Sequence, residues 1–270
     1  MTRTSLWDGH LVLLYESEQE HDANLAGWMR RGLERGEKVV VTRLPGEPEG
    51  RMLRLCHEAG VDPVQARLAG RVESLLPAQF YSAQRQDELI ARAFAEGFSG
   101  VRLNARASTA LSLLSERGYL AAEHAMDRHC RNGSVSALCA YTRPAPSYQP
   151  LRETLATHYD GVRSVGFSSW RGEDGVLLCG EVDLVTADVL AAALDAAVGT
   201  IGTAEELVLD LSRLDFIDVA GFRTLMRATA DFRAADGRLM LKRAQRPVAR
   251  TLRLLDVDGA PGVRLVDGAS

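Results

Sequence analysis

Long apolar runs are absent from this sequence. No segment of about 18 consecutive apolar residues occurs, so nothing in the chain predicts a helix that crosses a membrane. The opening residues, MTRTSLWDGH, lack the apolar core of a secretory signal peptide. Both absences favour a cytoplasmic protein that acts without a membrane partner.

An excess of positive charge is absent too. The chain has 32 Lys and Arg residues against 36 Asp and Glu residues, which gives a formal net charge of -4. Because a nucleic-acid-binding face needs clustered positive charge, we expect no direct nucleic-acid partner. The 270 residues, 46% hydrophobic and 25% charged, are enough for two soluble globular domains.

Cysteine is scarce, and no C-x-x-C pair occurs. The four cysteines stand apart in the chain, at Cys56, Cys130, Cys139 and Cys179. Isolated cysteines in apolar surroundings, in a reducing compartment, are usually small core residues rather than disulfide partners. We therefore expect buried cysteines, with Cys139 and Cys179 in strands.

The histidines follow no recognised zinc-binding spacing. His124 and His129 are five positions apart, whereas two ligands on one helix face are four apart. Cys130 adjoins them in sequence, and His10 and Cys139 could approach them in space. Capping and packing roles fit these side chains better, so we expect no metal and no other cofactor.

Strand and helix patterns alternate along the first half of the chain. Apolar, β-branched runs predict strands at His10–Tyr15, Lys38–Thr42, 72–76, 100–104 and 134–141. The helical spacing of apolar residues predicts helices at 23–35, 51–59, 78–95, 109–117 and 121–129. This order indicates an α/β fold with a mainly parallel sheet and helices on both faces.

The same half carries three short motifs. They are H-L-V-L-L-Y at His10–Tyr15, G-L-E-R-G-E-K-V-V-V at residues 32–41, and A-L-C-A-Y at residues 137–141. Together they make residues 8–160 resemble the MEDS domain, a sensory domain of regulators in methylotrophs and methanogens. The resemblance implies a RecA/KaiC-like fold without nucleotide chemistry, in a domain that senses a small ligand or a partner.

The residues between the first strand and the following helix lack the features of a nucleotide-binding site. A phosphate-binding loop needs G-x-x-x-x-G-K-[ST], whose backbone N–H groups and lysine hold the phosphates. Residues 15–22 read YESEQEHD instead, with four carboxylates and without Gly or Lys. We therefore expect a solvated acidic connection rather than an ATPase site.

The place of the missing phosphate loop also suggests a sharper interpretation. Ligands of open parallel sheets bind at the carboxyl ends of the strands. Tyr15, Glu16, Thr42 and Arg43 are predicted at that edge. We take them as candidate ligand-binding residues, for a small molecule that occupies the vacated cleft.

The second half centres on LVLDLSRLDFIDVAGFRTL, residues 207–225. Its apolar start predicts a buried strand, and Asp218 is a suitable N-cap for a following helix. Further strands are predicted at 166–170, 176–182, 238–242 and 262–265, and helices at 187–198, 221–234 and 247–255.

This segment carries the pattern D-L-S-x-L-x-F-I-D-x-x-G-F. The pattern, with GVLLCGEVDLVTADVLAAAL at residues 175–194, resembles STAS domains, the family of bacterial anti-sigma factor antagonists. The resemblance spans residues 165–266. Asp183, Asp210 and Asp218 match the family motif, and we interpret them as caps and loop hydrogen-bond acceptors rather than as an acid–base site.

One departure from the family pattern concerns regulation. In phosphorylated STAS proteins the residue after the motif's second Asp is Ser or Thr, which a partner kinase modifies. Here that residue is Val219, followed by Ala220, so no phosphate can be added there. Ser212 and Thr224 carry the nearby hydroxyls, and we expect neither to be phosphorylated, because they are predicted at a strand end and inside a helix.

The resemblance implies that the corner and the following helix bind an anti-sigma factor or a related kinase-like protein. Small and apolar residues suit such an interface because they are buried without leaving an unpaired charge. The candidates are Asp218, Val219, Ala220, Gly221, Phe222 and Arg223. The alternative is that Phe222 belongs to the core and the rest forms an ordinary corner.

These observations predict a non-enzymatic regulator with two domains. The MEDS-like sensory domain would occupy residues 1–160 and the STAS domain residues 161–270. The proline-rich stretch TRPAPSYQP, residues 142–150, marks the junction. Two alternatives stay open, a divergent nucleotide-binding ATPase of RecA-like fold and an oligomeric scaffold, and homo-oligomerisation is also compatible with a regulator.

Overall fold

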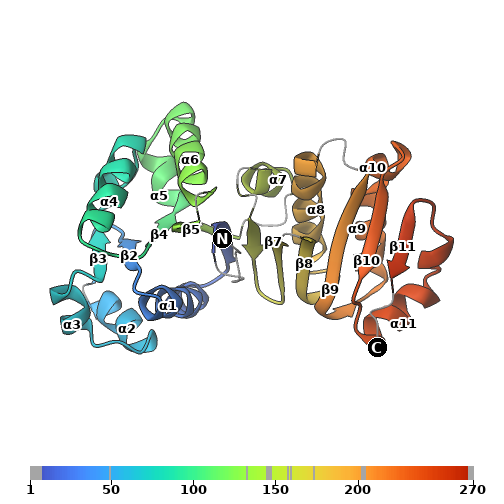
Figure 1. The fold of residues 1–270 in the computed structure, drawn as a ribbon, viewed down its shortest axis with the longest axis horizontal. Coiled ribbons are helices and arrows are strands. Elements are labelled where there is room, and N and C mark those ends of the chain that lie inside the picture. The colour runs from blue at the N-terminus through green and yellow to red at the C-terminus, as the bar shows by residue number, and fades with distance from the viewer. Residues whose placement is uncertain are drawn as a thin grey trace. The chain divides into compact units, whose positions relative to one another are not determined.

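The computed structural model describes residues 8–48, 50–131, 133–143, 148–156, 158, 160–172, 174–201 and 205–266. The chain forms two compact units, Met1–Arg143 and Pro144–Ser270 (Figure 1). The predicted boundary at residues 160 and 161 falls inside the second unit. Residues 144–147 of the predicted junction lie outside the described residues.

Five parallel strands form the sheet of the first unit. They are β1 (His10–Tyr15), β2 (Lys38–Thr42), β3 (Val72–Leu75), β4 (Val101–Arg106) and β5 (Val135–Thr142). Their order is β1-β5-β4-β2-β3, and each neighbouring pair is parallel. All carboxyl ends therefore meet at one edge of the sheet, which is where the first unit's charged cluster lies.

Helices cover both faces of this sheet. They are α1 (Glu18–Glu34), α2 (Gly50–Glu58), α3 (Pro63–Leu68), α4 (Ala83–Ala95), α5 (Ala107–Leu113) and α6 (Glu116–Arg131), with a 3-10 turn η1 (Pro77–Gln79). Figure 1 shows α1 and α2 on one face and α4, α5 and α6 on the other. The predicted mainly parallel sheet with helices on both faces is thus confirmed.

Helix α1 begins earlier than its apolar spacing predicts. Residues 16–22 were expected to form a polar connection, but the helix starts at Glu18. Ser17 is its N-cap and accepts from the backbone N–H of Glu20 at 3.2 Å, while the Glu20 carboxylate accepts from the N–H of Glu16 at 2.9 Å. Side-chain oxygens thus satisfy two backbone N–H groups around the helix start, and this draws the acidic segment into the helix.

The second unit combines antiparallel and parallel pairing. Its strands are β6 (Gly161–Arg163), β7 (Phe167–Gly172), β8 (Gly175–Val182), β9 (Glu206–Ile217), β10 (Arg238–Lys242) and β11 (Val263–Val266). The pairs β6–β7 and β7–β8 are antiparallel. The pairs β8–β9, β9–β10 and β10–β11 are parallel. The strands that precede α8 and α9 are therefore neighbours that run in the same direction.

The helices of the second unit are α7 (Tyr148–Ala156), α8 (Ala187–Ile201), α9 (Val219–Ala228), α10 (Ala230–Ala234) and α11 (Arg246–Leu254), with the 3-10 turn η2 (Val257–Gly259). One predicted helix, residues 221–234, is in fact two, because Thr229 leaves helical geometry at φ −104° and ψ 6°. The predicted strand end near Ser212 is also wrong, since β9 continues to Ile217. No helix in the described parts of the chain has the length and apolarity of a membrane span.

Candidate functional site

Two loops of the second unit lie side by side at the carboxyl ends of β8 and β9. Val182 and Ile217, the last residues of these strands, are partners in the parallel ladder. The backbone N–H of Asp218 extends the pairing and donates to the carbonyl of Val182 at 3.0 Å. The loop before α8 and the start of α9 therefore begin next to each other at this edge of the sheet.

Asp218 and Gly221 fix the corner that opens α9. The Asp218 carboxylate accepts from the Gly221 N–H at 2.7 Å, which confirms the predicted N-cap. A Cβ at Gly221 would lie 2.4 Å from Cγ1 of Val182 and 2.8 Å from its carbonyl oxygen. A side chain cannot fit in that space, so the glycine lets the first turn of α9 pack directly on β8.

The loop before α8 is ordered by its own side chains. Asp183 Oδ1 accepts from the N–H groups of Val185 at 2.9 Å and Thr186 at 3.0 Å. Asp210, on β9, pairs with Arg243 and accepts from the N–H of Ser212. The predicted roles are confirmed for Asp218 as a cap and Asp183 as a loop acceptor, whereas Asp210 lies inside β9 and forms an ion pair with Arg243.

Apolar side chains are exposed in the loop before α8, at the end of β9 and at the start of α9. The exposed fractions are 79% for Leu184, 63% for Val185, 47% for Phe216 and 47% for Val219. We call these four residues the apolar loop surface. They are held on a hydrogen-bonded corner and leave a water-facing apolar area beside a helix start.

The predicted partner-binding residues divide into exposed and covered positions. Val219 and Arg223 are exposed, whereas Asp218, Ala220 and Phe222 are half-buried. Gly221 is buried. Sequence reasoning missed Leu184, Val185 and Phe216, although two adjacent apolar residues in a polar loop could have indicated the first two.

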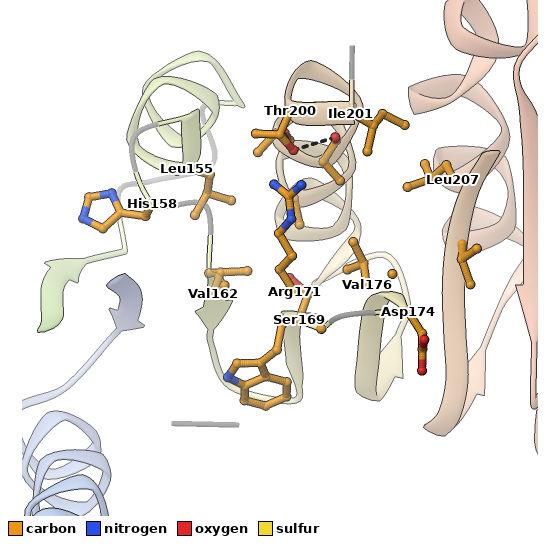
Figure 2. Close-up of a pocket in the computed structure, with 18 of the residues that line it drawn as sticks. Leu155, His158, Val162, Ser169, Arg171, Asp174, Val176, Thr200, Ile201 and Leu207 are labelled. Atoms are coloured by element: carbon orange, nitrogen blue, oxygen red, sulfur yellow. Dashed lines mark hydrogen bonds between the residues drawn. The ribbon is translucent and has the colours of Figure 1, made fainter. Parts of the chain in front are cut away.

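A cavity of about 290 Å³ lies elsewhere in the second unit. Figure 2 shows Arg171 of β7 extended between the strands and α8, with Thr200 and Ile201 near the end of that helix. Its wall includes Val176 and Leu207, near the amino ends of β8 and β9. The cavity is therefore at the edge of the sheet opposite the apolar loop surface and contributes nothing to it.

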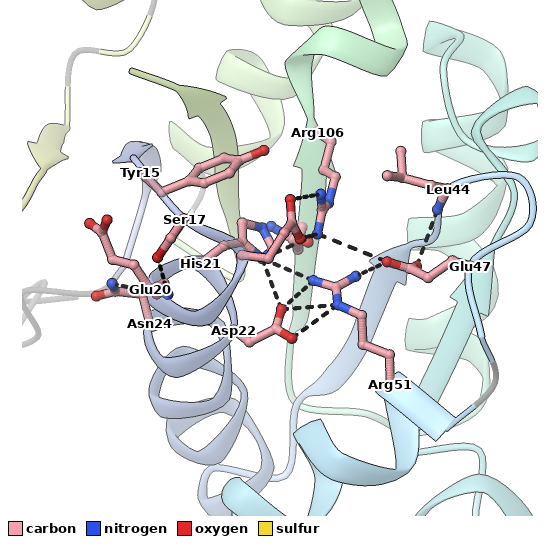
Figure 3. A network of polar contacts seen from close by, with 12 residues as sticks. Tyr15, Ser17, Glu20, His21, Asp22, Asn24, Leu44, Glu47, Arg51 and Arg106 are labelled. Carbon is pink, nitrogen blue, oxygen red and sulfur yellow. Dashed lines mark hydrogen bonds and ion pairs between the residues drawn. The ribbon is translucent and has the colours of Figure 1, made fainter. Parts of the chain in front are cut away.

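Charged side chains gather at the carboxyl edge of the sheet in the first unit (Figure 3). They come from the first turns of α1, from the loop after β2, from α2 and from the end of β4. We call the set the arginine cluster, and its members are Glu18, His21, Asp22, Glu47, Arg51 and Arg106.

Two buried arginines organise this cluster. Arg106 donates to both oxygens of Glu18, at 2.9 and 2.7 Å, and its residue is only 2% exposed. Arg51 donates to Asp22 at 3.0 Å and also to Glu47. Bidentate guanidinium–carboxylate contacts of this kind hold side chains in a fixed geometry. The carboxylates at this edge are thus paired with guanidinium groups rather than left to repel one another.

The cluster changes the proton affinities of its members. Burial lowers the pKa of His21, and although the hydrogen bond to Asp22 opposes this, the charges of Arg106 and Arg51 lower it further. Burial would raise the pKa of Asp22, but hydrogen bonds with His21 and Arg51 bring it well below its usual range. Hydrogen bonding to Arg106 lowers the pKa of Glu18. Folding therefore favours a neutral histidine between ionised partners.

Of the four candidate ligand-binding residues, one meets this cluster. The Tyr15 ring packs edge-on against His21, with centroids 4.8 Å apart, and lies 6.0 Å from the Arg106 guanidinium. Glu16 pairs with Arg143 at 3.3 Å. Thr42 is buried at the end of β2, and Arg43 continues the ladder with its N–H donating to the carbonyl of Leu75.

An apolar cavity of about 420 Å³ opens at the same edge. Its wall includes Leu44, Leu76, Thr109 and Leu113, from the segments that follow β2, β3 and β4. The Leu44 N–H donates to the carboxylate of Glu47, so one loop lines the cavity and also carries a member of the arginine cluster. An apolar hollow and fixed charges are thus adjacent where open parallel sheets bind ligands.

Two family models match the chain, one after the other. The model of the MEDS domain, described as the methanogen/methylotroph DcmR sensory domain, matches residues 9–159, more than half of the chain. The chain belongs to the MEDS family. A model described as "Mlab, STAS domain" matches residues 166–267, so a STAS domain follows the MEDS domain. Both predicted resemblances are confirmed.

Solved structures resemble parts of the chain. The anti-sigma factor antagonist SpoIIAA in its unphosphorylated form is 19% identical, with a TM-score of 0.31, and the match covers 38% of this chain and 89% of that one. The flagellar accessory protein FlaH from Methanocaldococcus jannaschii is 9% identical, with a TM-score of 0.44, and the match covers 63% of this chain and 76% of that one. No curated protein matches the chain in sequence. The MEDS and STAS domains together support a regulatory role.

Proposed function

We propose that this MEDS–STAS protein is a non-enzymatic, partner-switching regulator. The STAS domain binds an anti-sigma factor or a related kinase-like protein, and the MEDS domain senses a small ligand or another partner. The observation that carries the proposal is the apolar loop surface on the STAS domain. Four exposed apolar side chains on an ordered corner are what a protein partner can bury.

The chemistry of the corner specifies how binding is controlled. Val219 is the first residue of α9 and lies directly after the N-cap Asp218. Its side chain offers no hydroxyl, so the surface stays in the uncharged, binding-competent form. Control then passes from phosphate to the MEDS domain or to the amount of protein present.

The MEDS domain offers a place where a ligand can act. The arginine cluster and the adjacent apolar cavity together present fixed charges beside an apolar wall. In that place a small molecule would contact segments that follow three different strands. Binding there would order those segments, which is how a sensory domain changes its conformational preference.

The test uses two full-length variants as baits in a native extract. Val219→Asp puts a carboxylate into the apolar loop surface, where its desolvation would weaken partner binding at least about tenfold, or about 1.4 kcal/mol. Leu254→Asp is the matched control, because Leu254 is 76% exposed but lies at the far end of α11. Retained proteins are identified by mass spectrometry.

The proposal predicts one pattern of retention. The wild-type chain and Leu254→Asp retain an anti-sigma or kinase-like protein, and Val219→Asp does not. Equal retention by all three baits would show that the partner binds elsewhere. Retention of no such protein by the wild-type chain would remove the anti-sigma assignment itself.

A further inference from the structure

A second polar group lies inside the MEDS domain, between α6 and the strands β1 and β5. It consists of His10 at the start of β1, Glu123 on α6 and Cys139 on β5. Their exposed fractions are 0%, 8% and 4%. Nitrogen, oxygen and sulfur donors thus converge in a place that is closed to bulk water.

The register of the sheet explains why these residues meet. In the β1–β5 ladder His10 lies opposite Ala137 and Val12 lies opposite Cys139, so the two side chains are two residues apart on one face. Helix α6 packs on both strands. It therefore places Glu123 over the gap between them.

The distances resemble those between ligands of one metal ion. His10 Nε2 lies 3.3 Å from Glu123 Oε2 and 3.5 Å from Cys139 Sγ. The three donor atoms all lie within 4.8 Å of one another. Tetrahedral zinc, with bonds of about 2.1 Å to nitrogen and oxygen and about 2.3 Å to sulfur, separates such ligands by roughly 3.3–3.6 Å. A charge-assisted histidine–carboxylate hydrogen bond would be shorter, at about 2.7–2.9 Å.

We propose that His10 Nε2, the Glu123 carboxylate and Cys139 Sγ bind a divalent transition-metal ion of the zinc class. Such an ion accepts nitrogen, sulfur and carboxylate ligands together, whereas Mg²⁺ and Ca²⁺ prefer oxygen alone. Its charge offsets the cost of burying a carboxylate and a thiolate. The site is separate from the apolar loop surface, so its failure would leave the proposed function standing.

The surroundings of the site fit this assignment. Tyr119 precedes Glu123 by one turn of α6, interacts with its carboxylate, and shares a hydrogen bond with the Tyr141 hydroxyl. Outer hydrogen bonds of this kind orient metal ligands. Apolar residues of the same core, among them Met126, close the region to water. The group therefore has an oriented carboxylate within a dry shell.

Sequence spacing concealed this group. The three residues are 113 and 16 positions apart along the chain, and none belongs to a short ligand motif. His124 is exposed and His129 pairs with Asp87 at 2.7 Å. The two histidines considered as metal ligands in the sequence therefore do not belong to this group. Glu123, which sequence reasoning did not single out, completes the set.

Metal binding by the full-length chain is the test. After incubation with Zn²⁺ and dialysis, about one zinc per chain is expected by mass spectrometry. Incubation with Co²⁺ instead should give a thiolate-to-cobalt charge-transfer absorption. Glu123→Gln and Cys139→Ser should lower the affinity at least about tenfold, and Cys139→Ser should also abolish the charge-transfer band.

Two matched variants control for burial. Cys56→Ser changes another buried thiol of the same unit, and Asp127→Asn changes a buried acid one turn further along α6. Both should bind metal as the wild type does. The cobalt spectrum of the wild-type chain tests the proposal even if Cys139→Ser fails to fold. Absence of the thiolate-to-cobalt band, or of bound metal, in the wild-type chain overturns the proposal. Survival of the band in a folded Cys139→Ser variant overturns it equally.

Discussion

His21 is a histidine that folding keeps neutral. It is fully buried, its ring packs against Tyr15, and Arg51 lies 2.9 Å from its Nδ1. Protonation would put a third positive charge beside Arg51 and Arg106. In the unfolded chain these charges do not surround the histidine. Below about pH 6.5 His21 is therefore protonated in the unfolded chain but stays neutral in the folded chain.

This difference predicts the pH dependence of stability. Because the folded pKa of His21 is lowered, the free energy of unfolding should fall as the pH drops from about 7.5 to about 5.5. His21→Asn should flatten that dependence, since asparagine does not titrate. Urea unfolding across this range measures it. His124→Asn, at an exposed position, is the control, and an equal flattening there would contradict the assignment.

At the scale of elements, the contact between α9 and β8 depends on one glycine. Gly221→Ala places a methyl group against Val182, and such overpacking costs about 1–3 kcal/mol. Gly199 is the matched control, because it lies in α8 with no atom within 4 Å of an added Cβ. Gly199→Ala should stabilise by up to about 1 kcal/mol. Denaturant midpoints of both variants test this, and similar values would show that α9 moves freely on β8.

Periodicity predicted most elements, and local hydrogen bonding decided the ones it misplaced. The buried strands β1 and β2 have the predicted bounds because apolar, β-branched runs leave little choice of structure. The start of α1 was missed because its first turn is acidic rather than apolar. The N-cap Ser17, which accepts from the backbone N–H of Glu20, marks that start, and apolar spacing does not detect it.

The sequence predicted those site residues whose hydrogen bonds join positions close together in the chain. The Asp218 cap bonds three residues along the chain, and the motif contained it. The arginine cluster joins residues far apart, such as Arg51 to Asp22 over 29 positions and Arg106 to Glu18 over 88. One sequence does not encode such pairings in any visible pattern. Tyr15 was predicted as a site residue because it ends a strand, and the carboxyl edge of a parallel sheet can be predicted from the sequence.

At the scale of the whole molecule, the two units present different kinds of surface. In the arginine cluster of the MEDS domain the carboxylates are paired with arginines, whereas the STAS domain leaves apolar side chains in water. Recognition of the proposed anti-sigma partner is therefore expected to depend on burial of apolar area and little on long-range charge. Arg223 is the exposed charge among the candidate partner-binding residues.

Salt dependence tests this expectation. Raising the salt from about 0.1 M to about 0.5 M shortens the screening length from about 10 Å to about 4 Å and weakens exposed ion pairs. The affinity of the full chain for its partner should change less than about threefold. Titration calorimetry at the two salt concentrations measures it, with Arg223→Ala reporting any contribution of that charge. A loss above about tenfold would mean that ion pairs dominate the complex.

Because Val219 cannot be phosphorylated, the amount of this protein in the cell gains importance for the response. In the proposed function, a binding surface that cannot be phosphorylated is regulated by the number of chains, since each chain made can bind one copy of the anti-sigma partner. Output would stay low while the partner is in excess and rise steeply once the chains outnumber it. Synthesis and turnover of this protein would then set the threshold of the response, and a modest change in promoter strength would act as the switch.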